Sequence, residues 1–220
     1  MADKIKQHDF IEVNYTGKFK DESVFDTTNE TTAKKHNIFS PQIKYKPTII
    51  CVGEKQLIEG LDDALIDKEF GQEYIIELKP EEAFGKKNFK KIKLIPIAEF
   101  QKRKIQPQPG MQIDLDGEVG IVKSATGGRI IVNFNHPFAG KEVVYQVKIN
   151  KKITDQALQL KSFLELTFNQ KDLKVTVTEN KAEATLPFEL PELLTKELSK
   201  KLQDLTKLKE IKFKTEKKSS

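Results

Sequence analysis

The feature that most constrains this fold is a stretch of about fifty residues, 86–135, that has the pattern of a separate folded unit. Pro107-Gln108-Pro109-Gly110 predicts a turn, and Gly127-Gly128 predicts a hairpin between two β-rich runs. Strands are predicted at 89–95, 111–115, 118–124 and 129–134, and a short helix at 97–104. Residues 1–85 and 136–153 must then fold together as one domain that this insert interrupts.

The interrupted domain has the periodicity of an antiparallel sheet with one short helix. Ile11, Val13 and Tyr15 alternate with polar residues, which predicts a half-buried strand that Gly17 ends. Apolar residues at helical spacing predict a helix within 54–65. Further strands are expected at 23–26, 73–78 and 143–149, and a long polar loop at 27–46.

The charged pair Lys151-Lys152 predicts the boundary to a third, α+β domain over 154–220. Alternating runs predict strands at 162–168, 173–178 and 182–186, and a helix is expected from Pro191, followed by a strand with Ile211 and Phe213. The helix carries a leucine stripe: Leu194, Leu198, Leu202 and Leu205. A module of this size gains from packing on a partner, so we expect possible homodimerisation through it.

The charges are nearly balanced over the chain, with 38 basic and 33 acidic residues, which weakens a general nucleic-acid-binding interpretation. The insert is more basic, with ten basic and four acidic residues. Ribosome or RNA contact is a third-ranked alternative, and a solvated basic face explains the same charges.

Cysteine and histidine usage predicts neither disulfides nor a metal site. Cys51, the single cysteine, lies in the apolar run 49–52 and is expected in the core. His8, His36 and His136 lack ligand spacing, so no metal and no cofactor are predicted. The polar N-terminus and the absence of a membrane-length apolar run predict a cytoplasmic protein without membrane contact.

Four motifs occur in an order that resembles the FKBP-type peptidyl-prolyl cis-trans isomerases of the long, SlyD-like and archaeal kind. They are Val13-Asn14-Tyr15-Thr16-Gly17, Val24-Phe25-Asp26, Val52-Gly53 through Leu57-Ile58-Glu59-Gly60-Leu61, and Asn135-His136-Pro137-Phe138-Ala139-Gly140. The resemblance covers residues 9 to about 153 and implies an antiparallel half-barrel sheet wrapped around a short helix. It implies a mostly β chaperone insert in the flap and an additional C-terminal domain.

The resemblance implies an apolar prolyl pocket with one carboxylate. Its expected lining is Tyr15, Phe25, Asp26, Ile50, Leu57, Ile58, Leu61, Phe84 and Tyr145. Ile58 would donate its backbone N–H to a substrate carbonyl, and Leu61 would form the floor where short members have Trp. Asp26 would lie near the imide with no proton-transfer role, because bond rotation moves no proton. Phe84 replaces a Tyr of many members, which removes a hydrogen bond of about 1 kcal/mol.

The implied activity is peptidyl-prolyl isomerisation with chaperone assistance to proline-containing unfolded polypeptides. The insert would bind such chains, and the candidate residues are Phe89, Ile95, Phe100, Ile105 and Phe134. The same side chains are what the core of a small insert requires. The alternative is a holdase or assembly protein with a weak or vestigial isomerase pocket.

Overall fold

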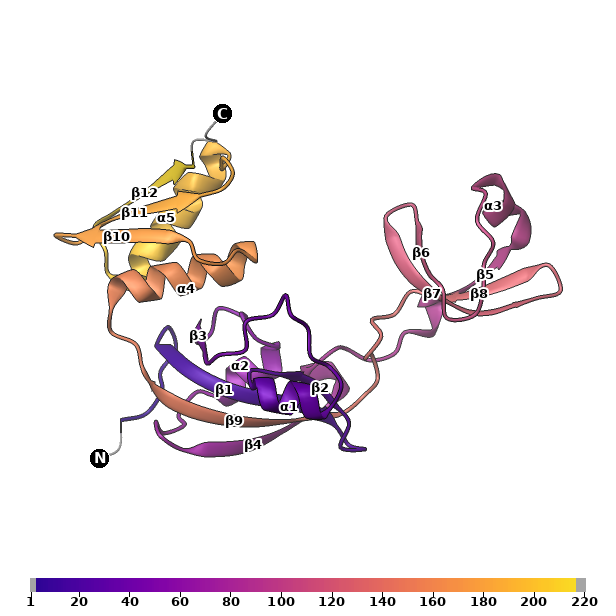
Figure 1. The fold of residues 1–220 in the computed structure, drawn as a ribbon, viewed down its shortest axis with the longest axis horizontal. Coiled ribbons are helices and arrows are strands. Elements are labelled where there is room, and N and C mark those ends of the chain that lie inside the picture. Colours follow the sequence, from indigo (N-terminus) through magenta and orange to yellow (C-terminus); the bar gives the residue numbers. More distant parts are fainter. Residues whose placement is uncertain (1–2, 217–220) are drawn as a thin grey trace. The chain divides into compact units, whose positions relative to one another are not determined.

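A computed structural model describes residues 3–216, which form two compact units. The first unit combines Met1–Leu78 with Val143–Ser220, and the second is the intervening segment Lys79–Glu142 (Figure 1). Each has its own sheets and core. Within residues 3–216, none of the helices combines the length and the hydrophobicity that crossing a bilayer requires.

The first unit contains a five-stranded antiparallel sheet in the order β2-β1-β9-β4, with β3 also paired to β1. The first half of β1 pairs with β3 and the second half with β2, while β9 covers its other edge (Figure 1). This confirms the predicted antiparallel sheet. The strands are β1 Phe10–Phe19, β2 Val24–Thr27, β3 Thr48–Cys51, β4 Glu73–Leu78 and β9 Val143–Lys152.

Two short helices accompany this sheet, and both differ from the prediction. α1 Glu30–Lys35 lies inside the expected loop 27–46, because the Asn29 side chain caps it by accepting a hydrogen bond from the Thr32 N–H. α2 Glu59–Ala64 is shorter than the expected helix in 54–65. It starts later because the Asp62 carboxylate accepts from the N–H groups of Gly53 and Lys55 and so holds the chain before Glu59 in a non-helical conformation.

The C-terminal residues of the first unit form a three-stranded sheet in the order β10-β11-β12, packed with two helices. The predicted strand at 162–168 is wrong, because these residues belong to a helix that Asp155 caps and that buries Leu160 and Leu164 on one face. The helix from Pro191 and the last strand are confirmed. The elements are α4 Gln156–Phe168, β10 Lys174–Thr178, β11 Lys181–Leu186, α5 Glu192–Thr206 and β12 Glu210–Thr215.

The C-terminal elements share a hydrophobic core with the five-stranded sheet. Phe10 of β1 and Cys51 of β3 belong to the same buried cluster as Leu160 and Phe163 of α4. α4 contacts β3 on one side and β10 on the other, and it lies between the two sheets in Figure 1. Ile153 continues the pairing past β9 by donating its N–H to the Phe10 carbonyl. Residues 154–220 therefore bury part of their apolar surface within their own chain.

The second unit contains a four-stranded antiparallel sheet in the order β5-β8-β7-β6, with one helix. Its core includes Phe100 and Phe134, and Ile95 and Ile105 pack against that core as partly buried residues. Phe89, in contrast, is 76% exposed. The elements are η1 Pro80–Glu82, η2 Phe89–Lys91, β5 Ile92–Pro96, α3 Ile97–Lys102, β6 Gln112–Leu115, β7 Glu118–Thr126 and β8 Arg129–Asn133.

Candidate functional site

Three neighbouring strands of the five-stranded sheet bring an aromatic cluster and a carboxylate together. Gly17 of β1 is opposite Asp26 of β2 and also opposite Tyr145 of β9. Tyr15 lies two residues before Gly17 on β1, so its side chain is on the same face of the sheet. Residues far apart in the sequence therefore converge because of strand register.

The rings of this cluster pack edge to face around Tyr145. The ring centroid of Tyr145 is 5.9 Å from that of Tyr15 and 5.8 Å from that of Phe25, with an interplanar angle of 87° in the second pair. Phe19, which the sequence argument did not single out, packs on Phe25 at 4.7 Å. These distances are typical of favourable aromatic pairs and define an apolar wall.

Gly17 makes this packing possible and does not end the strand as predicted. β1 continues to Phe19, and a Cβ atom at Gly17 would lie 2.8 Å from Cζ of Phe25 and 2.8 Å from Cε1 of Tyr145. Carbon atoms pack without strain at about 3.5 to 4.0 Å, so any larger residue would displace these rings. The glycine is part of the site because only a hydrogen atom fits beneath them.

Asp26 is the carboxylate of this cluster, and Tyr15 donates a side-chain hydrogen bond to it. Burial raises the pKa of Asp26, although the hydrogen bonds from Tyr15 and from the Thr27 backbone oppose that shift. Burial, together with the nearby Asp26 charge, also raises the pKa values of Tyr15 and Tyr145. Both phenols are therefore neutral hydrogen-bond donors at physiological pH.

Backbone and hydroxyl contacts fix Tyr15 in position. Its N–H donates to Oγ1 of Thr28 at 2.9 Å, and its carbonyl accepts from the Thr28 N–H at 3.0 Å. Thr16 and Thr27 share a hydroxyl hydrogen bond of 2.8 Å across the same strand pair. The sequence argument missed Thr28, whose only signal was its position directly after the Phe25-Asp26 pair.

The segment before α2 presents a backbone donor. Ile58 is the N-cap of α2, and its carbonyl accepts from the N–H groups of Leu61 and Asp62. Within residues 3–216, no group accepts a hydrogen bond from the N–H of Ile58 itself. Leu57 and Ile58 are half-buried, whereas Ile50 and Leu61 are completely buried. The backbone N–H of Ile58 can therefore donate a hydrogen bond to a carbonyl group of a ligand.

Phe84 belongs to the second unit and has its own aromatic neighbours there. Its ring stacks on His136, with centroids 4.8 Å apart and an interplanar angle of 3°, and lies 5.1 Å from the ring of Phe138. The first unit thus brings together four of the predicted site residues: Tyr15, Phe25, Asp26 and Tyr145. Phe84 lies in the second unit, where it packs with His136 and Phe138.

The cluster offers apolar walls, one carboxylate and neutral donors. Burial raises the pKa of the Cys51 thiol to about 12, so this side chain is no nucleophile at physiological pH. In the described part of the chain, histidine, cysteine and carboxylate residues form no group of three that could bind a metal ion. The chemistry that this arrangement can support is the binding and reshaping of an apolar, amide-containing group.

Comparison with known proteins agrees with this geometry. The family model for FKBP-type peptidyl-prolyl cis-trans isomerases matches residues 2–108, and a model named FKBP26, IF domain, matches residues 93–138. The chain is 34% identical over 149 residues to a short-type peptidyl-prolyl cis-trans isomerase of Methanocaldococcus jannaschii, a match that covers 68% of this chain and 94% of that protein.

Two bacterial relatives extend the comparison. The FKBP-type 16 kDa peptidyl-prolyl cis-trans isomerase of Escherichia coli is 27% identical over 154 residues, covering 68% of this chain and 94% of that protein. SlyD of Helicobacter pylori is 25% identical over 118 residues, covering 51% of this chain and 63% of that protein. With the ordered motifs and the sheet that carries them, these matches show that the chain belongs to the FKBP-type peptidyl-prolyl cis-trans isomerases.

Proposed function

We propose that this protein isomerises X-Pro bonds in unfolded polypeptides at the Tyr15-Phe25-Asp26-Tyr145 cluster and that its insert acts as a chaperone domain. The observation that carries the proposal is the convergence of three aromatic rings and one half-buried carboxylate around Gly17. The Ile58 N–H, which has no acceptor among residues 3–216, would bind a substrate carbonyl. Ile50, Leu57 and Leu61 would complete the apolar lining.

The mechanism follows from the electronic structure of the peptide bond. Its rotation barrier of about 18 to 20 kcal/mol arises from resonance, and water stabilises the dipolar planar form. An apolar pocket that excludes water disfavours that planar form relative to the twisted transition state. Lowering the barrier by about 5 kcal/mol accelerates the reaction by about four orders of magnitude.

Tyr15 and Asp26 would orient the reacting group rather than transfer protons. The hydrogen bond from Tyr15 to Asp26 holds a partial negative charge at a fixed place beside the aromatic wall. Fixed dipoles in a site that excludes water act more strongly than mobile ones in solution. Phe84 has no hydroxyl group, so any substrate contact through it would be apolar.

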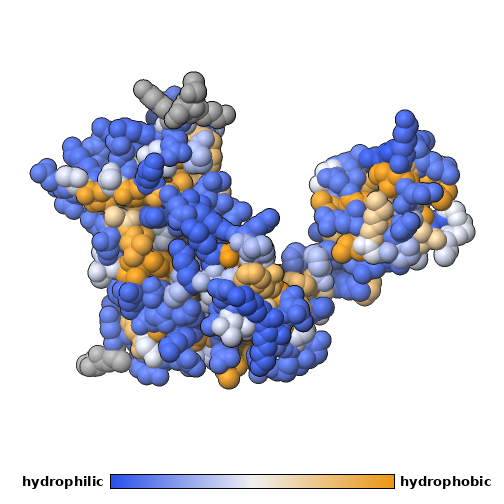
Figure 2. Space-filling view, in the orientation of Figure 1, coloured by the Kyte–Doolittle hydropathy of each residue, from blue (hydrophilic) through white to orange (hydrophobic). Residues whose placement is uncertain are grey.

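The insert has exposed apolar side chains that suit client binding. Figure 2 shows hydrophobic residues on its surface, and the exposed members are Phe89, Leu94, Ile97, Met111 and Val119. Among the predicted client-binding residues, Phe89 is accessible, whereas Phe100 and Phe134 lie in the core and would support the fold. The strands β5 and β6 form the two edges of the insert sheet, and an extended client could pair with either.

Placing the client-binding surface and the pocket on one chain would raise the local concentration of prolines at the pocket. We therefore divide the chain by function. Residues 1–85 with 136–153 would carry out isomerisation, residues 86–135 would bind client polypeptides, and residues 154–220 would form an accessory domain. Homodimerisation through 154–220 would use the exposed Leu193 and Leu194, because Leu198, Leu202 and Leu205 are buried within the chain.

The Tyr15→Phe variant tests the isomerase site. It removes the hydroxyl group that binds Asp26 and keeps the ring, so we expect kcat/KM on a proline-containing tetrapeptide to fall by about tenfold. Tyr45→Phe is the matched control, since the Tyr45 hydroxyl only links residues of its own loop, accepting from the Ser40 N–H and donating to the Ile38 carbonyl. Equal rates for parent, variant and control would refute the site assignment.

A holdase with a weak pocket is the second candidate, and the missing hydroxyl at Phe84 favours it. Asn88 and Asn135 hydrogen bond to each other at the base of the insert, so residues 89–134 can be replaced by a short glycine linker. An isomerase with a chaperone insert keeps its rate on the tetrapeptide and loses rate on a proline-limited refolding protein. A pure holdase shows little rate on either substrate before or after the replacement.

A further inference from the structure

The segment Gly53–Ile58, which joins β3 to α2, carries the Ile58 N–H but has no regular secondary structure. Hydrogen bonds to neighbouring residues hold its first four residues. The Asp62 carboxylate accepts from the N–H groups of Gly53 and Lys55 at 3.1 and 2.8 Å, and the Gln56 side chain accepts from the Cys51 N–H at 2.8 Å. Glu54, which lies between Gly53 and Lys55, has no part in these bonds.

Glu54 is held by the C-terminal elements instead. Its side chain is only 9% exposed and forms an ion pair with Nζ of Lys201 on α5, and Nε2 of His8 lies 3.6 Å from its carboxylate. The Lys201 ammonium also lies over the ring of Phe163 on α4, 5.6 Å from the ring centroid. A carboxylate with this little solvent contact requires a cationic partner, because an unpaired charge there is poorly solvated.

The surrounding structure keeps Lys201 at this place. Phe163 belongs to the core cluster that also contains Cys51, the residue at the end of β3 from which the segment departs. A second set of contacts joins α4 and the turn that follows it to the chain before β3. There, Lys44 pairs with Asp172, and Nζ of Lys171 donates to the Gln42 carbonyl.

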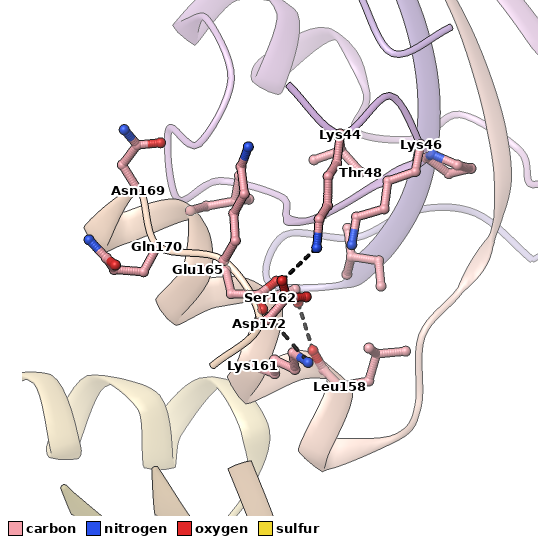
Figure 3. Close-up of a pocket in the computed structure, with 14 residues that line it drawn as sticks. Lys44, Lys46, Thr48, Leu158, Lys161, Ser162, Glu165, Asn169, Gln170 and Asp172 are labelled. Atoms are coloured by element: carbon pink, nitrogen blue, oxygen red, sulfur yellow. Dashed lines mark hydrogen bonds and ion pairs between the residues drawn. The ribbon is translucent and has the colours of Figure 1, made fainter. Parts of the chain in front are cut away.

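These contacts border a groove of about 280 Å³ that α4 and the residues before β3 line (Figure 3). In Figure 3, dashed lines join Lys44 to Asp172 and Lys161 to Glu165, and a further line marks the hydrogen bond from the Ser162 hydroxyl to the Leu158 carbonyl. Lys44 therefore joins the chain before β3 to the turn after α4, whereas Lys161 pairs with Glu165 within α4, and neither charge requires an external ligand.

We infer that Lys201 is a positioning residue for the isomerase reaction: through Glu54 it fixes the segment that presents the Ile58 N–H to the substrate. The inference rests on the proposed role of Ile58 in substrate binding. The C-terminal domain would then contribute to isomerase activity within a single chain, without contacting the substrate. Loss of the ion pair would let the segment Gly53–Ile58 move, and the substrate would bind less tightly.

The test compares Lys201→Met with Lys200→Met in the full chain. Both changes remove one positive charge from α5, and Lys200 is exposed beside Lys201. For Lys201→Met we expect KM on a proline-containing tetrapeptide to rise about fivefold, the size expected for one partly exposed ion pair, with kcat changed less than about twofold. The amide NMR signal of Ile58 should shift or broaden. Lys200→Met should change neither quantity.

Two further variants separate positioning from a general loss of stability. Lys201→Arg keeps the charge and should restore KM and the Ile58 signal. Glu54→Gln removes the same ion pair from the other side and leaves only the Lys201 charge, which water solvates because that side chain is 51% exposed, so it should reproduce the KM change even where Lys201→Met folds poorly. An unchanged KM and an unchanged Ile58 signal in Glu54→Gln would overturn the inference.

Failure of the proposed function gives a different result. If the parent chain has no measurable isomerase rate while the Ile58 signal still depends on Lys201, the positioning contact stands and the role of the segment in catalysis is refuted. If the parent is active and the Ile58 signal is the same in Lys201→Met and Lys200→Met, the positioning inference is refuted and the proposed function stands.

Discussion

Gly17→Ala is the change that most directly probes the site, because it adds a single methyl group at a known place. The new Cβ would lie 2.8 Å from both Cζ of Phe25 and Cε1 of Tyr145, against about 3.5 to 4.0 Å for relaxed carbon contacts. Both rings must therefore move by roughly an ångström. Gly17 lies in a regular strand, so alanine adds no backbone strain, and we expect a loss of about 1 to 3 kcal/mol from overpacking alone.

The assay for this variant measures kcat/KM on a proline-containing tetrapeptide together with urea unfolding. We expect kcat/KM to fall by at least about tenfold, because about 1.4 kcal/mol of lost transition-state binding gives that factor. Gly71→Ala is the control, since Gly71 has a φ of +77° and nothing within 4 Å of an added Cβ. It should lower stability through backbone strain and leave kcat/KM unchanged. A normal kcat/KM in Gly17→Ala would refute the assignment of the aromatic wall.

Three further predictions follow from burial and from the separate cores. Asp26→Asn should stabilise the protein at pH 7, because burial raises the folded-state pKa of Asp26 and its charged form therefore opposes folding. Urea unfolding should show that this gain in stability disappears below about pH 3.8, the ordinary pKa of an aspartate, where both states are protonated. Cys51 should resist thiol reagents at pH 9 in the native protein and react once urea unfolds it, since its folded pKa is about 12. Phe100→Ala should destabilise the insert by about 3 to 5 kcal/mol and leave tetrapeptide activity intact, so calorimetry should show one transition moving alone.

Much of the fold could be predicted from local patterns. The strands and the last helix follow from hydrophobic periodicity and from turn residues, which act over a few positions. The failed strand prediction at 162–168 has a local cause as well. Residues 162–168 alternate in polarity over a short window, and only the Asp155 cap and the buried Leu160 before that window reveal the helical period.

The sharing of a core between the first sheet and the C-terminal elements could not be predicted in this way. Phe10 and Cys51 have the composition of ordinary strand residues, and the sequence does not say which apolar surface covers them. The structure places them in one core cluster with α4, and Leu198, Leu202 and Leu205 of α5 are buried in the same cluster. Contacts between distant segments depend on tertiary packing, which local propensity does not encode.

Some residues of the candidate site could likewise be predicted from the sequence, whereas others depend on tertiary packing. The family resemblance implied a cluster of Tyr15, Phe25, Asp26 and Tyr145, and the structure brings these residues together. The role of Gly17 depends on strand register, because the glycine matters only when Tyr145 is opposite it. A residue whose function is to leave space has no chemical signature in the sequence.

Several features of the first unit oppose stability. The Asp26 carboxylate is half-buried and its charged form is disfavoured, Gly17 lies inside a strand, and the Ile58 N–H has no acceptor among residues 3–216. Such features persist where surrounding structure stabilises them. Here the surrounding structure includes the C-terminal elements, which extend the core beneath β1 and β3 and supply Lys201 to Glu54. If the proposed site is correct, these elements would support catalysis by stabilising the residues around it, without contacting a substrate.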